Sequence, residues 1–237
     1  MRTLNEIEQL GLWERGQRRH PIDRALLALA AALPEMSCES LADWPIGRRN
    51  QALTQLHCRC FGARLRAWTQ CVNCGEKLEI ELNAELLAGG ETEPRNRADE
   101  PVTAVGCTFR LPTSRDLARA AGKTEPGAGA VIIAESCLCG GSLSAEWSEE
   151  DLAAIGDKLS AADPLAETRL ALHCPDCGKD WLGTLDMVSF FWTELEARVR
   201  RVLSAIHALA AAYGWSEAEI LSLSEHRRAL YLEMIQV

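Results

Sequence analysis

Apolar residues recur at three- and four-residue steps along the last quarter of the chain, which is the spacing of one face of an α-helix. The pattern predicts a single long amphipathic helix that starts after Asp186 and ends near Tyr213, with Gly214 as its stop. Ser216-x-x-Glu219 has the form of a capping box for a short helix, and Ser224 is placed to cap a final one. The apolar positions of the long helix are Val188, Phe191, Trp192, Leu195, Val199, Val202, Leu203, Ile206 and Leu209.

The first third of the chain also has helical character. Thr3-x-x-Glu6 has the form of a capping box, and it precedes an apolar pattern that predicts a first helix. Pro21 stands where a first-turn proline belongs, ahead of an alanine- and leucine-rich helix predicted over 22–33. A third helix is predicted over about 47–61, because Gly62 lies just past its end.

The middle of the chain predicts shorter elements. Val102–Leu111 is typical of a strand or hairpin, and Thr113-x-x-Asp116 opens a short helix after it. The apolar stretch Ala128–Leu138 suits a helix or a buried strand, of which we favour the helix. Ser148-x-x-Asp151 starts another helix, and Asp163-Pro164 resembles the N-cap and first proline of one more helix that leads toward His173.

Alternation of apolar and polar residues marks two further stretches, Glu76–Asn83 and Lys179–Asp186, and predicts a short strand in each. Both stretches follow the same CxxCG knuckle, Cys71-Val72-Asn73-Cys74-Gly75 and Cys174-Pro175-Asp176-Cys177-Gly178. In such a knuckle two backbone N–H groups can point at the first thiolate. The glycine supplies either a positive φ or room for a close backbone approach.

Two such pairs give four thiolates, the number that a closed tetrahedral zinc site requires. The sequence therefore predicts two half-ribbons, separated by 99 intervening residues, that close on one structural zinc ion. Two other interpretations stay open, a cytosolic dithiol with redox activity and two unrelated pairs of reduced thiols. The predicted zinc ligands are Cys71, Cys74, Cys174 and Cys177.

Together these elements predict an α+β fold that is mostly helical, with a small split zinc-ribbon β element formed by the two CxxCG half-ribbons. The stretch 89–100 is polar, contains proline and has no apolar rhythm, so it is interpreted as a linker. The regions that we expect are an N-terminal helical region (1–66), a first half-ribbon (67–88), the linker (89–100), an inserted α+β segment (101–166), a second half-ribbon (167–190) and a C-terminal helical region (191–237).

The net charge of −9 is distributed unevenly along the chain. Residues 1–66 carry ten Arg and seven Asp/Glu, whereas residues 75–170 carry nine Lys/Arg and eighteen Asp/Glu. Nucleic-acid-binding proteins usually present a basic face, and here the region that follows the first knuckle is the most acidic one. We therefore expect no nucleic-acid partner.

Ten cysteines would suggest disulfides in a secreted protein. However, Met1–Glu6 lacks the basic-then-apolar run of a signal peptide, and no apolar stretch is long enough to span a bilayer. We expect a cytoplasmic protein with no membrane partner, in which the cysteines are metal ligands or buried thiols.

Two CxC pairs, Cys58-Arg59-Cys60 and Cys137-Leu138-Cys139, could form a second metal site, with His57 or His173 as a further ligand. CxC is a poor knuckle, and each pair falls at an expected helix end, so we interpret these cysteines as buried thiols. The sequence lacks a Gly-rich phosphate loop, a nucleophile elbow and an HExxH motif. We expect a protein that is not an enzyme and has no small-molecule substrate.

Several stretches resemble a family of baseplate proteins from contractile phage tails and related contractile injection systems. The similarity touches most of the chain, and its C-terminal part is the most specific. Val72 departs from the proline that this family often has in the first knuckle. The stretches are Leu12–Gly16, Pro21–Leu26, Pro45–Asn50, Phe109–Leu117, Trp192–Leu195, His207–Ala210, Tyr213–Leu221 and Arg227–Leu232.

The resemblance implies a structural or chaperone-like role in baseplate assembly, with hub, spike or wedge proteins as partners. It also implies that the chain could enter a phage or phage-tail-like particle. The alternative is a free-standing zinc-ribbon adaptor or regulatory protein that could associate with nucleic acid. The acidic ribbon favours the baseplate role. The C-terminal segment carries more apolar residues than a free tail needs, and it predicts a partner-binding surface of Trp215, Arg227, Arg228 and Tyr231.

Overall fold

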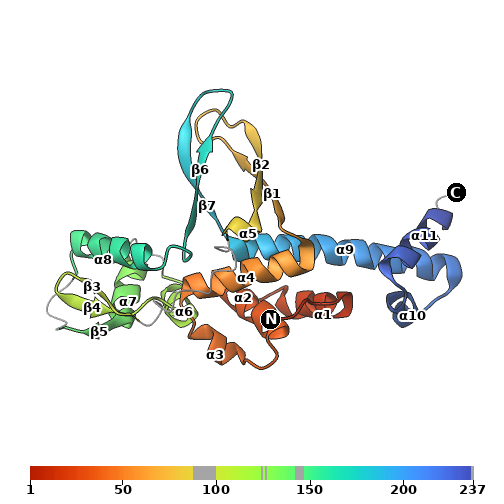
Figure 1. Ribbon diagram of the computed structural model, residues 1–237, viewed down its shortest axis with the longest axis horizontal. Coiled ribbons are helices and arrows are strands. Elements are labelled where there is room, and N and C mark those ends of the chain that lie inside the picture. Colours follow the sequence, from red (N-terminus) through yellow and green to blue (C-terminus); the bar gives the residue numbers. More distant parts are fainter. Residues whose placement is uncertain (88–99, 124, 126, 142–146, 236–237) are drawn as a thin grey trace.

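A computed structural model of the chain describes residues 1–87, 100–123, 125, 127–141 and 147–235. One long helix, α9 (Met187–Tyr213), runs through the molecule, with other helices packed along it and two hairpins rising from the helical body (Figure 1). A small mixed unit lies at one end of the molecule, and two short helices lie at the other. The architecture is therefore mixed helix and strand, with small antiparallel sheets. Among the described residues, no helix is long and apolar enough to cross a bilayer.

Four helices form the N-terminal region; three of them pack on α9, and the short fourth packs on one of these three. The largest core lies between them and includes Leu12, Leu29, Leu53 and Phe191. The predicted capping box of the first helix was placed two residues too early, because Asn5 caps the helix and Glu8 completes the box. The other two predicted helices are confirmed, and a short fourth helix lies between them. The helices are α1 (Glu6–Gly16), α2 (Pro21–Ala32), α3 (Cys38–Ala42) and α4 (Ile46–Phe61).

Each CxxCG knuckle joins the two strands of an antiparallel hairpin. In the first hairpin, β1 (Arg64–Gln70) pairs with β2 (Lys77–Asn83), and the short helix α5 (Ala84–Leu87) follows. In the second, β6 (Thr168–His173) pairs with β7 (Asp180–Leu185), and α9 follows. The strands after the knuckles are as predicted. The hairpins begin at Arg64 and Thr168, and β6 occupies the place where the sequence predicted a helix leading to His173.

The inserted segment forms a small unit with a separate apolar core around Phe109, Cys137 and Ile155. A three-stranded antiparallel sheet in the order β3-β4-β5 packs with helices α7 and α8. The predicted helices at Thr113, Ala128 and Ser148 are confirmed, whereas the predicted linker lies almost entirely outside the described residues. The elements are β3 (Val102–Ala104), β4 (Cys107–Phe109), α6 (Ser114–Ala120), α7 (Ala128–Cys137), β5 (Leu138–Gly140) and α8 (Glu149–Ala162).

Asp163 ends α8 and does not begin another helix, which corrects the interpretation of Asp163-Pro164 as an N-cap. Its carboxylate instead accepts a hydrogen bond from the Gly47 amide, at 2.8 Å, in the first turn of α4. The same junction contains a hydrogen bond from the Ile46 amide to the Pro112 carbonyl, at 3.0 Å. These contacts attach the inserted segment to the N-terminal helices.

The C-terminal region follows the predicted pattern closely. Gly214 ends α9 in the left-handed conformation, with φ +69°. Ser216 and Glu219 form the capping box of α10 (Glu217–Ser222), and Ser224 accepts a hydrogen bond from the amide of Arg227 at the start of α11 (Glu225–Ile235). Both short helices pack against the end of α9 (Figure 1).

Candidate metal centre

The bases of the two hairpins share a small apolar cluster on the helical body. Leu65 of β1, Ala84 of α5 and Met187 of α9 are buried there, with Leu82 and Leu185 packed against them. Since Leu82 is the last residue but one of β2 and Leu185 is the last residue of β7, both hairpins are anchored at the same place. Their tips carry the knuckles, and the knuckle cysteines of the two hairpins come together.

The two knuckles have the same backbone hydrogen bonds. In the first, the Cys71 amide donates to the Glu76 carbonyl and the Gly75 amide donates to the Cys71 carbonyl, each at 2.9 Å. The equivalent bonds in the second knuckle, from Cys174 to Lys179 and from Gly178 to Cys174, are also 2.9 Å.

The glycine of each knuckle is required by its backbone conformation. Gly75 has φ +75° and Gly178 has φ +68°, values that side-chain-bearing residues rarely adopt. A Cβ at either position would meet open space. The positive φ is therefore the reason for glycine, and a close backbone approach is not.

The four cysteine sulfurs lie within 4.8 Å of one another, so the structure brings together all four predicted ligands. The Sγ–Sγ distance is 3.6 Å between Cys71 and Cys177, and it is also 3.6 Å between Cys74 and Cys174. A tetrahedral site with metal–sulfur bonds of about 2.3 Å has sulfur–sulfur edges of about 3.8 Å. A disulfide would need about 2.05 Å. The geometry therefore fits four thiolates around one metal ion.

Backbone amides face the first sulfur of each knuckle. The amides of Cys74 and Asn73 lower the pKa of the Cys71 thiol, and the Asn73 amide lies 3.4 Å from its Sγ atom. In the second knuckle the amides of Cys177 and Asp176 also face the Cys174 sulfur, but desolvation and the Cys71 thiol outweigh them and raise the pKa of Cys174. This confirms the expectation of paired amides, which stabilise a thiolate and so prepare it to bind a cation.

The second cysteines of the two knuckles differ from each other. The Asn73 side chain donates to the Cys177 sulfur and, together with the Lys179 amide, lowers the pKa of Cys177 to about 6. The Glu76 amide also favours the Cys74 thiolate, but desolvation and the neighbouring thiols outweigh it and raise the pKa of Cys74 to about 12. Four adjacent thiols cannot all ionise without a compensating positive charge, and a divalent cation between them would supply it.

Asn73 is a contact that sequence reasoning missed. It lies in the first knuckle, yet its side chain contacts a cysteine of the second. The residue at the equivalent position of the second knuckle is Asp176, so the two knuckles do not make this contact reciprocally. Only the three-dimensional pairing of the hairpins reveals it, because the chain separates Asn73 from Cys177 by about a hundred residues.

The two CxC pairs do not form a second metal cluster within the described part of the chain. Cys137 is buried in the core of the inserted segment, and burial raises its pKa to about 12. Partial burial also raises the pKa of Cys58 and of Cys60. These two are only half-buried and Cys139 is exposed, so the interpretation as buried thiols holds for Cys137 alone. His173 is exposed and its Nδ1 atom lies 2.8 Å from Asp180, so it takes no part in the cysteine cluster.

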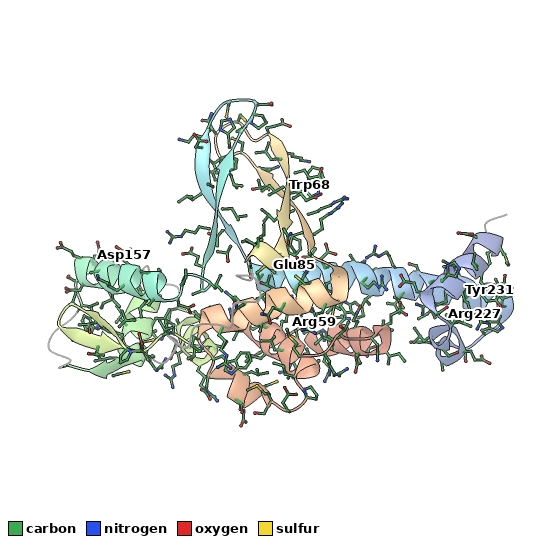
Figure 2. The ribbon with its side chains drawn as sticks, in the orientation of Figure 1. Arg59, Trp68, Glu85, Asp157, Arg227 and Tyr231 are labelled. Atoms are coloured by element: carbon green, nitrogen blue, oxygen red, sulfur yellow. The ribbon has the colours of Figure 1, made fainter. Side chains whose placement is uncertain are left out.

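The predicted partner surface lies at the C-terminal end of the molecule, where Figure 2 labels Arg227 and Tyr231. Trp215 stacks on Tyr213, with ring centroids 4.7 Å apart, and meets the edge of Tyr231 at 5.0 Å. Arg227 is exposed. Arg228 points inward instead, is 5% exposed and forms an ion pair with Glu6 of α1. Arg228 therefore holds α11 against α1, while Arg227 faces solvent.

Comparisons with family models, with curated proteins and with solved structures give no match for this chain.

Proposed function

We propose that Cys71, Cys74, Cys174 and Cys177 hold one structural zinc ion that fastens the tips of the two hairpins. The supporting observation is the cluster of four sulfurs at distances suited to a tetrahedron. Sets of four thiolates bind zinc or iron, and a site with all four positions taken by protein has no open position for catalysis. The role that this arrangement supports is mechanical.

Loss of one ligand is the test of that role. Cys174→Ser leaves a three-thiolate site, and metal binding here is part of the folding free energy. We expect a loss of about 3–5 kcal/mol, or about 10 °C in melting temperature for a chain of this size. The control is Cys107→Ser, which changes a buried cysteine outside the cluster and should cost about 1 kcal/mol. Equal effects from the two variants would contradict a structural metal.

We propose further that the protein is a structural or chaperone-like component of the baseplate of a contractile phage-tail-like system. Stretches that resemble the baseplate family contact one another, as shared residues in a shared fold would. Gly16 lies against the Trp192 ring so closely that a Cβ there would be 2.0 Å from the ring. The Arg24 guanidinium lies over the same Trp192 ring, 5.1 Å from its centroid.

A second pair of these stretches meets at the junction with the inserted segment. Pro45 and Thr113 form an isolated antiparallel bridge, and Arg49 donates to the Ser114 hydroxyl at 3.2 Å. Arg49 is buried, as is Asp116, which receives a bidentate pair of hydrogen bonds from Arg110 at 2.7 and 2.9 Å. The residues that carry the resemblance are thus internal contacts, which supports a resemblance in fold.

Mass spectrometry of purified contractile particles tests the baseplate role. We expect either the chain itself in the particle or, if it acts only during assembly, a failure of particle formation when its gene is deleted. Complementation with the wild-type gene is the control for polar effects of the deletion. If the deletion strain still forms normal particles, the proposal is contradicted.

The alternative, a zinc-ribbon adaptor that contacts nucleic acid, has one supporting observation. Trp68 is 70% exposed on the side of the first hairpin that faces away from the second (Figure 2). However, the neighbouring Arg64 and Arg66 both pair with Glu81, each at 3.4 Å, so these three residues together carry a net charge of only +1. A DNA-binding assay over a range of salt concentrations distinguishes the two proposals, since phosphate contacts produce a steep salt dependence.

A further inference from the structure

Two adjoining hollows lie between α1, α9 and the helices α10 and α11. One has a volume of about 440 Å³ and the other about 200 Å³, and Glu6, Arg198 and Glu225 line both. Because they share these residues, the hollows form one groove, divided by a bridge of charged side chains. We call it the α1–α11 groove, and its remaining lining residues include Leu4, Ile7, Gln9, Leu221, Arg201, Val202, Ala205, Arg228, Ala229 and Leu232.

The bridge across the groove consists of connected ion pairs. Arg198 lies 2.9 Å from the Glu225 carboxylate and 3.4 Å from that of Glu6, and Arg228 pairs with the other oxygen of Glu6. Both glutamates are therefore already compensated. Arg201 makes no ion pair within the described residues and is exposed at the rim. Three arginines face two glutamates, so the groove has an excess of one positive charge.

Two deeply buried polar side chains of the lining each keep one atom without a hydrogen-bond partner in the described part of the chain. They are Gln9, through Oε1, and Arg228, through Nη1. Both side chains belong to residues that are at least nine-tenths buried. Unpaired buried polar atoms cost free energy. Each of these two atoms has less than 1 Å² of exposed surface, so both lie behind the groove wall and are not open to a bound ligand.

Four apolar residues line the smaller hollow, beside the five charged residues Glu6, Arg198, Arg201, Glu225 and Arg228. Val202 and Ala205 of α9 and Leu232 of α11 contribute to its wall. A volume of about 200 Å³ is somewhat larger than the ~150 Å³ apolar cavity that binds benzene. The hollow therefore has room for one aliphatic or aromatic side chain. Ile7, which is 62% exposed, extends the apolar surface beside the larger hollow.

We propose that the α1–α11 groove binds a segment of a partner protein that carries an apolar side chain next to a carboxylate. The apolar side chain enters the smaller hollow, and the carboxylate lies at the exposed guanidinium of Arg201 on the rim, where it compensates the excess positive charge of the groove. This proposal rests on the assembly role, and it specifies the chemistry of the segment that a partner presents. It also changes the predicted docking surface, because Arg228 acts inside the groove and Arg201 replaces Arg227 as the exposed cation.

The test uses the full-length protein and a phage-displayed library of random dodecapeptides. We expect enrichment of sequences in which Asp or Glu lies next to Leu, Ile, Met or Phe. The most enriched peptide is then synthesised with a fluorescent label, and its affinity is measured by fluorescence anisotropy. Arg201→Glu should weaken its binding by about tenfold or more, because it places a like charge beside the carboxylate.

Arg200→Glu is the matched control, because it makes the same charge change one residue away on α9, where Arg200 pairs with Glu196 outside the groove. We expect its effect to be within about twofold, as for other exposed pairs. Ala229→Trp fills the smaller hollow from an exposed position and should abolish binding. A peptide whose acidic residue is replaced by Lys should bind Arg201→Glu better than the wild type.

Three results would overturn the proposal: no enrichment, enriched peptides without a carboxylate, or equal loss of binding in Arg200→Glu and Arg201→Glu. The measurement needs no contractile particle. If the protein binds such peptides but particles form without it, the groove proposal stands and the baseplate role is contradicted. If particles need the protein but it binds no such peptide, the baseplate role stands and the groove proposal is contradicted.

Discussion

Asp163 caps a helix that lies far from it in the sequence. The N-cap residue of α4 is Pro45, and no side chain next to it in the sequence caps the helix. The Asp163 carboxylate, at the end of α8, accepts the hydrogen bond from the Gly47 amide instead. A carboxylate at a helix N-terminus satisfies a free amide and interacts favourably with the helix dipole. The sequence analysis placed Asp163 at the start of a helix that follows it, which is wrong; the tertiary fold brings its carboxylate to α4 instead.

Removal of this cap should be costly. Asp163→Ala leaves the buried Gly47 amide without its acceptor, and we expect the free energy of unfolding to fall by about 1–2 kcal/mol. Asp163→Asn keeps an acceptor oxygen and should recover about half of that loss or more. Asp157→Ala, an exposed change on the same helix, should be close to neutral. Urea unfolding of the three variants measures these differences, and equal stability of Asp163→Ala and Asp157→Ala would contradict the tertiary cap.

His57 makes the stability of the fold depend on pH. It is 1% exposed, it packs against Phe61 and Phe190, and burial lowers its pKa to about 4. In the unfolded chain its pKa is about 6.5. The unfolded state therefore binds a proton first as the pH falls, and stability that is present above pH 6.5 is lost progressively down to about pH 4.

The shift corresponds to about 3 kcal/mol. We expect His57→Leu to remove this part of the pH dependence, so that the difference between the two proteins changes by about this amount between pH 7 and pH 4. Taking the difference cancels the effect of acid on the cysteine site, which both proteins share. Unfolding curves that stay parallel over this pH range would show that His57 does not titrate as its burial requires.

At the scale of elements, the longer helices were predictable, whereas the short helices α3 and α5 and the strands β1, β5 and β6 were not. The long helix α9 carries apolar residues on one face over many turns, so its period is unambiguous. The strands β1 and β6 are short and contain Arg66, Trp68 and Arg169, and much of their surface is exposed. They become strands because each pairs in register with the strand beyond its knuckle. That pairing is non-local information which a short pattern does not contain.

The contact between α1 and α9 depends on a missing side chain. Gly16 is buried in the last turn of α1 against the Trp192 ring, and a Cβ would approach within 2.0 Å of that ring. Gly16→Ala must displace either the helix or a large buried ring, so we expect a loss of about 1–3 kcal/mol.

Gly11→Ala is the control on the same helix, because a Cβ there meets no neighbour. We expect it to raise stability by up to about 1 kcal/mol through helix propensity. Thermal unfolding of both variants checks the pair of expectations. If Gly16→Ala stabilised the protein as much as Gly11→Ala, the close approach of the two helices would be refuted.

At the scale of the whole molecule, the cysteine cluster connects segments that the chain keeps apart. Its four cysteines were predictable because each knuckle has a local signature and a closed zinc site needs four thiolates. The orientation of Arg228 was not predictable, since its burial depends on Glu6 at the other end of the chain. Sites defined by local spacing can thus be inferred from the sequence, whereas surfaces defined by which side of a helix is covered require the fold.

The central claim is that one zinc ion, bound by Cys71, Cys74, Cys174 and Cys177, fastens the two hairpins. The most direct measurement is elemental analysis of the full-length protein, purified without added metal, against protein concentration from amino-acid analysis. The account predicts one zinc per chain in the wild type and in Cys107→Ser, and a loss of zinc in Cys174→Ser. A folded wild-type protein that contains no zinc, or a Cys174→Ser variant that retains it in full, would contradict the claim.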